Sequence, residues 1–555
     1  MYNLLIGGAA GQGIDTTVAM LEKLLKRSGY SVFTSRDFMS RIRGGHNFTQ
    51  IRFGAEPVLC HSDSLDGIIA LNEETIDLHR SRLAPDGFIL CDSSLATDDP
   101  KAIKIDISGM AKAAGNPRAA GSVAIGAAMK LFSEDLNAVR DVFQSAIREE
   151  FLDANLKAAA AGYEAVGSRY PHFDGPFGDD MILSGSKALA LGAIAAGLRF
   201  YSAYPMSPST PILEYLAANA ADAGIVVEQA EDEIAAINMA IGASYAGAIA
   251  MTGTSGGGFS LMVEALGLSG MAEIPLVVVD VQRPGPATGL PTRTEQSDLK
   301  FVISAAQGEF PRMVIALRHH ADAFWQTIRA LRLAEQYQIP VILLSDQYLG
   351  DSSATVRPFD LSRIQPAANL AESVEDEEYL RYRFTESGIS PRLLPGKTGH
   401  LVLADSDEHD ESGWITESAE VRRQMVDKRM RKLKRLEKDL QEPEFIGPQV
   451  FDTLLIGWGS THGPITEAIG LLNKSQGGGV AALVFGDVFP LPQKLLLEKA
   501  AAAKQIVNIE QNATGQLAEL IREKAGVKCA ASILKYDGRQ ISGEEIADRL
   551  REMNQ

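Results

Sequence analysis

The sequence has few cysteines. Only three occur among 555 residues, Cys60, Cys91 and Cys529. They are too few and too far apart for a disulfide framework or for the four thiolates that hold an iron–sulfur cluster. Any cluster chemistry connected with this protein must therefore belong to another chain.

Long apolar runs and excess positive charge are also missing. No apolar run reaches the ~20 residues of a membrane-spanning helix, and the chain does not begin with a signal-peptide pattern, so we expect a cytoplasmic protein. The 53 Lys and Arg against 71 Asp and Glu give a net charge of −18, which disfavours nucleic acid as a partner. The length predicts three or four domains.

The first domain, residues 1–175, begins as strand, glycine loop and helix. Tyr2 to Ile6 is apolar, Gly7 to Gly13 follows, and Thr16 to Lys26 has helical periodicity. The loop amides could bind a phosphate. A tight turn that lets helix and strand pack closely explains the glycines equally well, and the spacing Gly-x-x-Gly-x-Gly is not that of dinucleotide sites.

Two further stretches of this domain lack regular patterns. Ser40 to Asn47 (SRIRGGHN) is a basic, glycine-rich stretch that we interpret as a loop, in which His46 is more typical of a surface residue than of a catalytic base. Ser168 to Asp180 is polar, aromatic and rich in Gly and Pro, which indicates a linker.

Residues 181–356 alternate regularly between strands and helices. The predicted strands are Phe200 to Tyr204, Ile225 to Glu228, Ala248 to Thr252 and Pro275 to Val281, and the predicted helices are Pro211 to Ala221, Asp232 to Tyr245 and Phe259 to Met271. This alternation indicates a parallel sheet covered on both faces. Ligands bind beyond the carboxyl ends of such strands, where this sequence places hydroxyls, acids, glycines and Arg283.

The composition then becomes more charged, and residues 357–446 are predicted to connect two domains. Thr416 to Gln441 carries Lys, Arg and Glu at helical spacing, which indicates a solvated or interdomain helix. Residues 447–555 form a last α/β domain with predicted strands at Thr453 to Gly457, Val480 to Phe485 and Ile506 to Glu510.

Three motifs resemble 2-oxoacid:ferredoxin oxidoreductase alpha subunits. Tyr204 to Pro211 (YPMSPSTP) is similar to the family's Tyr-Pro-Ile-Thr-Pro signature, and Glu231 to Ala236 (EDEIAA) and Val281 to Thr292 (VQRPGPATGLPT) match further family segments. Gly7 to Gly13 and Arg43 to Asn47 resemble the gamma domain that one subfamily fuses before its alpha subunit. The resemblance covers nearly the whole chain.

The resemblance implies a three-domain α/β chain: a gamma-type domain, a pyrimidine-binding domain of thiamine diphosphate enzymes and a domain like the transketolase C-terminal domain. It also implies oxidative cleavage of a 2-oxoacid, with single electrons passed to ferredoxin and an acyl-CoA as product. A beta subunit would hold the cofactor's diphosphate, Mg²⁺ and a 4Fe-4S cluster, in a dimer of alpha–beta heterodimers. This chain has no Gly-Asp-Gly diphosphate motif, so we expect it to be inactive alone.

The sequence departs from the family at three motif positions. Ser207 stands where many relatives have Thr, and Met206 where they have Ile. Pro284 stands where relatives often have glycine, and proline removes an amide donor. The resemblance therefore supports side-chain roles better than backbone contacts in this segment.

Site residues carried over from the family fall into four groups. Glu233 matches the acid that faces N1′ of the aminopyrimidine, whereas Glu231 and Asp232 fit acids that only favour a helix dipole. The predicted cofactor-binding residues are Tyr204, Pro205, Ser207, Glu233, Thr254 and Ser255. The predicted substrate residues are Arg283, Ser207, Thr288 and Thr292. The predicted coenzyme A residues are Gly11, Gly13, Arg43 and His46, and no metal ligand is expected in this chain.

Three questions stay open at this point: the role of the hydroxyls, the identity of the 2-oxoacid and whether the chain is catalytic at all. The guanidinium of Arg283 suits a substrate carboxylate. The hydroxyls of Ser207, Thr288 and Thr292 could bind the same ligand, but they could equally cap turns. The fused gamma domain favours 2-oxoglutarate over pyruvate, branched-chain or aryl 2-oxoacids, and a distal carboxylate would need Arg41, Arg43, Arg293 or a beta-subunit residue. A non-catalytic nucleotide-binding scaffold or electron-transfer partner is the alternative of another class, and it would make the predicted site accidental.

Overall fold

The computed structural model describes residues 1–38, 44–365, 379–475 and 479–553. The chain forms two compact units: residues 1–184 with 351–359 and 542–544, and the remaining residues from 185 onward. No helix in these described ranges has the length and apolarity needed to cross a membrane.

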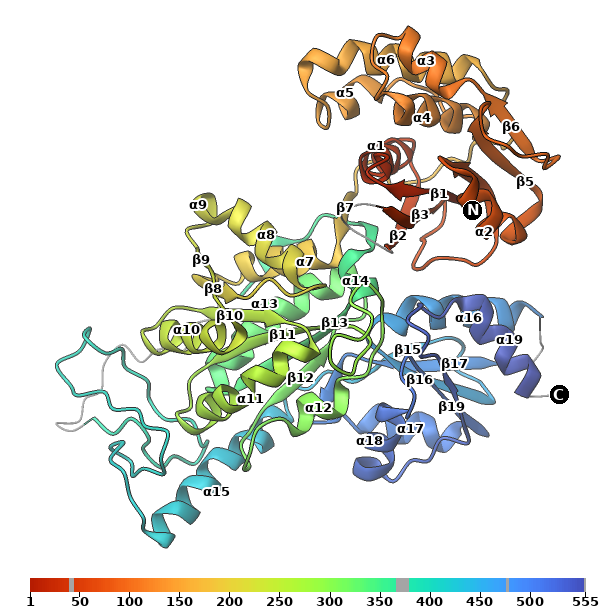
Figure 1. Cartoon of the computed structure of the whole chain (residues 1–555). Coiled ribbons are helices and arrows are strands. Elements are labelled where there is room, and N and C mark those ends of the chain that lie inside the picture. The colour runs from red at the N-terminus through yellow and green to blue at the C-terminus, as the bar shows by residue number, and fades with distance from the viewer. Residues whose placement is uncertain (39–43, 366–378, 476–478, 554–555) are drawn as a thin grey trace. The chain divides into compact units, whose positions relative to one another are not determined.

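The first unit contains an eight-stranded mixed sheet in the order β6-β5-β4-β1-β3-β2-β14-β7. Its strands are β1 (Tyr2–Ala10), β2 (Ser31–Asp37), β3 (Gly44–Gly54), β4 (Leu65–Ala70), β5 (Leu83–Asp92), β6 (Ala102–Ile105), β7 (Met181–Ser184) and β14 (Ser353–Val356). Its helices are α1 (Ile14–Arg27), α2 (Glu73–His79), α3 (Ile107–Ala113), α4 (Ala120–Leu131), α5 (Val139–Gln144) and α6 (Glu149–Glu164), shown in red and orange in Figure 1.

The limits of this unit differ from those expected from the sequence. Strands β7 and β14 lie in the sheet of the first unit, whereas the predicted boundaries gave residues 181–356 to the next domain. β14 pairs antiparallel with both β2 and β7, so the chain returns to this sheet after crossing the second unit's first domain. The predicted linker, residues 168–180, contains no helix or strand.

The second unit is built on a seven-stranded sheet in the order β18-β12-β13-β11-β10-β8-β9. Its strands are β8 (Phe200–Ala203), β9 (Val226–Gln229), β10 (Ala250–Thr254), β11 (Leu276–Gln282), β12 (Met313–Ala316), β13 (Pro340–Asp346) and β18 (Asp487–Phe489). Its helices are α7 (Gly185–Ala195), α8 (Thr210–Ala218), α9 (Ala220–Ala223), α10 (Glu233–Tyr245), α11 (Gly256–Met271), α12 (Leu299–Ser304), α13 (His320–Tyr337) and α14 (Gln347–Asp351).

The sequence explains the centre of this sheet. β11 is a fully buried run rich in valine, as a central parallel strand covered on both faces requires. Helix α11 packs Phe259 on one face against Val278, and helices α7 and α13 pack so closely that a Cβ at Gly192 would meet the Phe324 backbone. The predicted parallel sheet with covering helices is confirmed (Figure 1).

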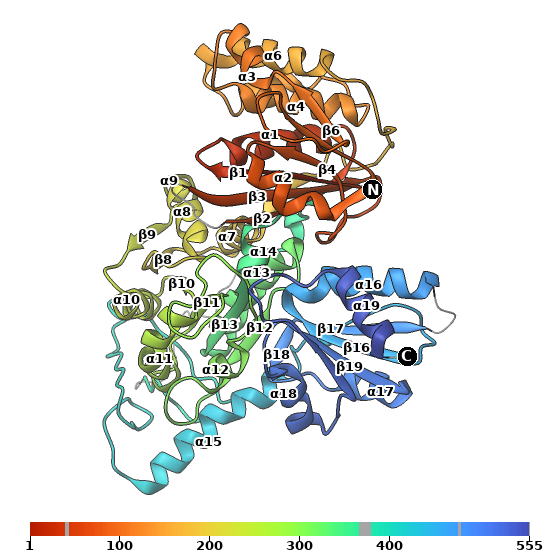
Figure 2. The same cartoon turned by 45° about the vertical axis from the view of Figure 1, so that its right-hand side comes forward.

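The C-terminal part forms a five-stranded sheet in the order β15-β17-β16-β19-β20. Its strands are β15 (Glu444–Ile446), β16 (Thr453–Trp458), β17 (Val480–Phe485), β19 (Gln505–Glu510) and β20 (Ala531–Leu534). Helices α16 (His462–Ser475), α17 (Lys494–Ala502), α18 (Gln516–Ala525) and α19 (Gly543–Met553) accompany it (Figure 2). Helix α15 (Ala419–Leu436) lies apart from this sheet, and its Lys428 and Lys432 contact Glu273 and Gln338 of the larger-sheet domain.

The C-terminal sheet and the seven-stranded sheet belong to one unit. β18, which follows β17 in the chain, pairs antiparallel with β12 of the larger sheet. Arg329 of α13 holds Asp487 of β18 with two hydrogen bonds of 2.6 and 2.7 Å. One hydrophobic core includes Val314 from the larger sheet and Phe485 from the smaller one. The predicted α/β fold class is therefore confirmed, and two of the three sheets share a core.

Candidate active site at the carboxyl edge of the seven-stranded sheet

Four of the predicted motifs meet at one edge of the seven-stranded sheet. β9, β8, β10 and β11 are neighbours and run parallel, so their carboxyl ends lie on the same side. The register places Thr254 at the end of β10 opposite Asp280 of β11. The segments after these four strands carry the predicted cofactor and substrate residues.

Glu233 is the buried acid of the three at the start of α10. Asp232 is the cap of this helix, because its Oδ1 accepts a hydrogen bond of 2.7 Å from the Ala235 amide. Glu231 is exposed, whereas Glu233 is only 3% exposed. Glu233 Oε1 is buried without a hydrogen-bond partner among the described residues. A buried carboxylate oxygen with no partner is costly unless a ligand completes it.

A glycine turn brings Thr254 to Glu233. Helix α11 begins Gly256-Gly257-Gly258, and a Cβ at Gly258 would overlap both Thr254 Oγ1 and Glu233 Oε1. Ser255, at the cap position of the same helix, is fully buried and its Oγ has no partner in the described structure. The turn therefore places the Thr254 hydroxyl and the Glu233 carboxylate in one buried space, with the buried Ser255 next in the chain.

Arg283 and Ser207 are also brought together. Arg283 follows β11, and its Nη1 donates a hydrogen bond of 2.6 Å to the carbonyl oxygen of Ser207, in the loop after β8. The contact uses the Ser207 backbone, not its hydroxyl. Burial lowers the pKa of Arg283 from its ordinary value, and the nearby carboxylate of Asp298 opposes this.

The remaining predicted residues of this edge lie further out. Tyr204 is 40% exposed, Pro205 and Thr292 are half-buried, and Thr288 is exposed. Within the described residues, no hydrogen bond joins either threonine to the Arg283–Ser207 pair. Their hydroxyl contacts with substrate stay a prediction.

Sequence reasoning missed two residues of this edge. Asp280 lies within the buried strand β11, and Asp298 caps helix α12. Asp280 stands in an apolar run, Leu276–Gln282, and only the alternation of side chains across a strand could have flagged it. Asp298 is 18 residues further on, and its position beside β11 depends on the fold.

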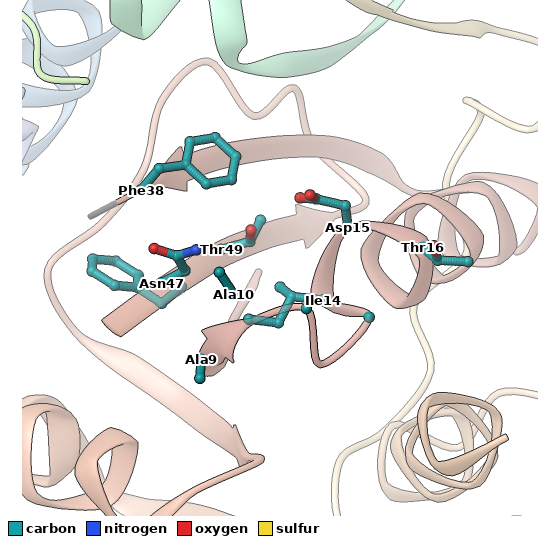
Figure 3. A pocket seen from close by; sticks show the side chains of 11 residues that line it. Ala9, Ala10, Ile14, Asp15, Thr16, Phe38, Asn47 and Thr49 are labelled. Carbon is teal, nitrogen blue, oxygen red and sulfur yellow. The ribbon is translucent and has the colours of Figure 1, made fainter. Parts of the chain in front are cut away.

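The glycine loop of the first unit borders a cavity of about 410 Å³. Gly11 and Gly13 line it, and both have positive φ, 92° and 79°, which glycine adopts without strain. Figure 3 shows Asn47 and Thr49 on strand β3 and Asp15 at the start of α1 around the same space. Asp15 is the charged residue among the described lining. Arg41 and Arg43 lie outside the described residues.

The interpretation of His46 as a surface loop residue is wrong. Residues 44–47 belong to β3, which pairs with β1, and His46 is 8% exposed. Its Nε2 lies 2.8 Å from His79 Nε2, and burial lowers the pKa of both rings, that of His79 to about 3. Pairing with β1, opposite Ala9, overrides the loop preference of the Gly44-Gly45 sequence. His46 is not among the described residues that line the cavity.

Three side chains in the second unit resemble a metal-ligand set. Ligand atoms of His319, Glu444 and His462 lie within 4.8 Å of one another. However, His319 Nδ1 accepts a hydrogen bond of 3.2 Å from the Asp322 amide. The neutral ring then carries its proton on Nε2 and has no lone pair left for a metal. The set offers two ligands, and we assign no metal to it.

Comparison with known proteins identifies the family. Residues 191–428 match the family described as pyruvate flavodoxin/ferredoxin oxidoreductase, thiamine diP-bdg, and residues 3–165 match pyruvate ferredoxin/flavodoxin oxidoreductase. A 2-oxoacid:ferredoxin oxidoreductase subunit alpha from Sulfolobus sp is 32% identical, over 98% of this chain and 96% of its own. The chain belongs to the 2-oxoacid:ferredoxin oxidoreductase alpha subunits.

Other relatives of this alpha subunit agree. The 2-oxoglutarate oxidoreductase subunit KorA from Mycobacterium tuberculosis is 35% identical, over 74% of this chain and 64% of its own. A solved 2-oxoglutarate:ferredoxin oxidoreductase from Magnetococcus marinus, with 2-oxoglutarate, coenzyme A and succinyl-CoA bound, is 33% identical. It matches with a TM-score of 0.94 over 100% of this chain and 99% of that one.

The residues of the alpha subunit fit thiamine diphosphate. The family match over residues 191–428 names this cofactor, and that segment contains Glu233, Thr254 and Ser255. Glu233 Oε1 and Ser255 Oγ are buried polar atoms without partners in the described structure, as expected where a ring with polar nitrogens completes the site. The alpha subunit is therefore part of a thiamine diphosphate oxidoreductase.

Proposed function

We propose that this chain is the alpha subunit of a 2-oxoglutarate:ferredoxin oxidoreductase. The reaction converts 2-oxoglutarate, CoA and two oxidised ferredoxins to succinyl-CoA, CO₂ and two reduced ferredoxins, and it is reversible. The observation that carries this proposal is the Glu233 oxygen Oε1, buried without a partner among the described residues, at the same edge of the sheet as the Arg283–Ser207 contact. The 0.94 TM-score to an enzyme with 2-oxoglutarate bound supports the substrate.

In the proposed site, one group of residues binds the cofactor ring, a second forms the loop over the ligand and Arg283 binds the substrate. Bound thiamine diphosphate supplies a nucleophilic carbon and an electron sink. Glu233 accepts a hydrogen bond from its ring, and Thr254 and Ser255 line the same buried space. Tyr204, Pro205 and Ser207 form the loop after β8 that faces the ligand. Arg283 binds the substrate carboxylate.

A beta subunit would complete the enzyme. The chain has three cysteines and no Gly-Asp-Gly motif, so the 4Fe-4S cluster, Mg²⁺ and the diphosphate site fall to the partner. We propose a dimer of alpha–beta heterodimers that transfers electrons to ferredoxin. The test is to assay the co-expressed pair with a panel of 2-oxoacids, CoA and a one-electron acceptor. Activity with pyruvate or branched-chain acids alone would show that 2-oxoglutarate is not the substrate. A colourless, inactive homomer would support a non-catalytic scaffold.

Arg283→Lys tests the substrate role. Lysine keeps the charge but loses the paired geometry of a guanidinium, and a hydrogen bond to a charged group is worth ~1.5–3 kcal/mol. We expect the KM for the 2-oxoacid to rise roughly tenfold or more, the KM for CoA to change little, and Arg283→Ala to be worse. Small and equal changes in both KM values would place Arg283 outside the pocket.

The cavity beside Gly11 and Gly13 is our proposed site for a phosphate of CoA. Loop amides and the predicted Arg43 would attract the phosphate, and Asp15 would oppose it. We expect Arg43→Ala to raise the KM for CoA, and Asp15→Asn to lower it, each by about two- to fivefold, as for partly screened charges. If steady-state kinetics show no change in either variant, the glycine loop is a structural turn.

A further inference from the structure

Two carboxyl groups face each other behind the proposed substrate arginine. Asp280 is fully buried in β11, and neither of its oxygens has a hydrogen-bond partner among the described residues. Gln282 lies two residues further on the same strand face, and its Oε1 accepts a hydrogen bond of 3.0 Å from the Asp298 amide. This bond fixes Asp298 beside Asp280, with Asp298 Oδ2 also buried and unpartnered in the described structure.

The two carboxyls cannot both be ionised at neutral pH. Burial, followed by the neighbouring Asp298, raises the pKa of Asp280 well above its ordinary value. Burial also raises the pKa of Asp298, to about 6. Carboxyls this close titrate as a pair and hold one proton between them over a wide range.

The pair lies at the other end of the glycine turn that holds Glu233. A Cβ at Gly256 would lie 2.5 Å from Asp298 Oδ2, and one at Gly258 would overlap Glu233 Oε1. A side chain at Gly256 would therefore disturb Asp298, and a side chain at Gly258 would disturb Glu233. The acid pair is thus part of the candidate site and not of a remote core.

Besides Asp280, Arg283 and Glu295 are the described titratable groups that interact electrostatically with Asp298. Arg283 follows β11, and its guanidinium interacts with the Asp298 carboxylate. Glu295 lies four residues before the start of α12; burial raises its pKa to about 7, and the Asp298 charge contributes to this rise. In the described sheet the residues paired with Asp280 are uncharged, Thr254 on β10 and Leu344 on β13, and Glu233 is the acid at the other end of the glycine turn.

We propose that the Asp280–Asp298 pair is a proton-holding positioning element that keeps Arg283 directed toward Ser207 and the substrate carboxylate. With one proton, the pair carries a single negative charge, and Arg283 keeps its 2.6 Å bond to the Ser207 carbonyl. With no proton, the pair carries two charges, which draw the guanidinium toward Asp298. Loss of the proton therefore weakens 2-oxoacid binding. This inference rests on the proposed role of Arg283.

The test is the pH dependence of the 2-oxoacid KM in the complex with the beta subunit. In the native enzyme we expect this KM to rise at least threefold from pH 6.5 to 9, while the KM for CoA stays flat. Asp280→Asn leaves Asp298 as the single charge of the pair over this pH range and should flatten the rise. Glu295→Gln is the control and should keep it. Asp298→Asn, in which the pair can never carry two charges, is the second variant and should remove the two-charge state as well.

A second measurement separates the two proposals. A buried protonated carboxyl gives an infrared carbonyl band, which should be present in the native complex and lost in Asp280→Asn. An absent band, or an unchanged KM profile in Asp280→Asn, would overturn the positioning role. A present band together with an Arg283→Ala variant of normal 2-oxoacid KM would instead overturn the substrate role of Arg283, and with it this inference.

Discussion

Replacing Glu233 with glutamine is expected to slow exchange of the C2 proton of bound thiamine diphosphate by roughly 10²–10⁴, the usual contribution of an acid–base group. The buried oxygen Oε1 of Glu233 has no partner among the described residues and is therefore available to a ring nitrogen of the cofactor. The hydrogen bond to that nitrogen depends on the negative charge of the carboxylate. Glutamine keeps the shape of the side chain and loses that charge. The exchange is started in D₂O with the assembled alpha–beta complex, stopped with acid and measured by NMR.

Glu231→Gln is the matched control for this experiment. Glu231 is exposed two residues before Glu233, so a pure helix-dipole effect would make the two variants nearly equal. Titration with thiamine diphosphate should show that both variants still bind it. Normal exchange in a Glu233 variant that assembles correctly would show that Glu233 does not activate the cofactor. Glu228, which is exposed, and Asp232, which caps α10, would then be the next acids to test.

Glu273→Gln is expected to lower the free energy of unfolding by about 3–5 kcal/mol, the usual cost of leaving buried charges without a partner. Lys428 Nζ lies 2.6 Å from Glu273 Oε1, Lys432 binds the other oxygen, and all three side chains are at most 1% exposed. Burial would raise the pKa of Glu273, but the two lysines outweigh it and lower the pKa. Burial lowers the pKa of Lys432 to about 8.

Urea denaturation followed by tryptophan fluorescence measures this loss. Because the pKa of Glu273 is lowered by folding, its stabilisation is present above the ordinary carboxyl pKa and decreases in acid. Asp452→Asn is the control, since Asp452 pairs with Lys504 on the surface, where a salt bridge contributes about 1 kcal/mol or less. Equal effects of the two substitutions would show that the buried cluster is not stabilising.

The strand ends of the site were predictable because they depend on local pattern. The run after β8, the acids before α10, and the residues after β10 and β11 each follow a recognisable apolar strand, and parallel strands bring their ends together. The assignment of Glu233 rather than Asp232 came from the family resemblance. The structure adds a physical difference, since Asp232 caps the helix and Glu233 is buried.

Features that depend on partners distant in sequence were not predictable. Gly44 and Gly45 suggest a loop until β1 pairs with them, and the charged helix α15 gives no sign that Lys428 meets Glu273, 155 residues earlier. The Asp280–Asp298 pair likewise needs the turn of the chain after β11. Each case is a tertiary contact that overrides the local preference.

Strand β18 has a consequence for how this polypeptide can be divided. It covers the edge of β12, whose backbone donors and acceptors would otherwise be open to any other strand. A protein cut between residues 446 and 447 would not give two self-sufficient fragments, because the first would keep an incomplete sheet. The fragments would recover the native state by complementation, in which the second returns its strand to the first.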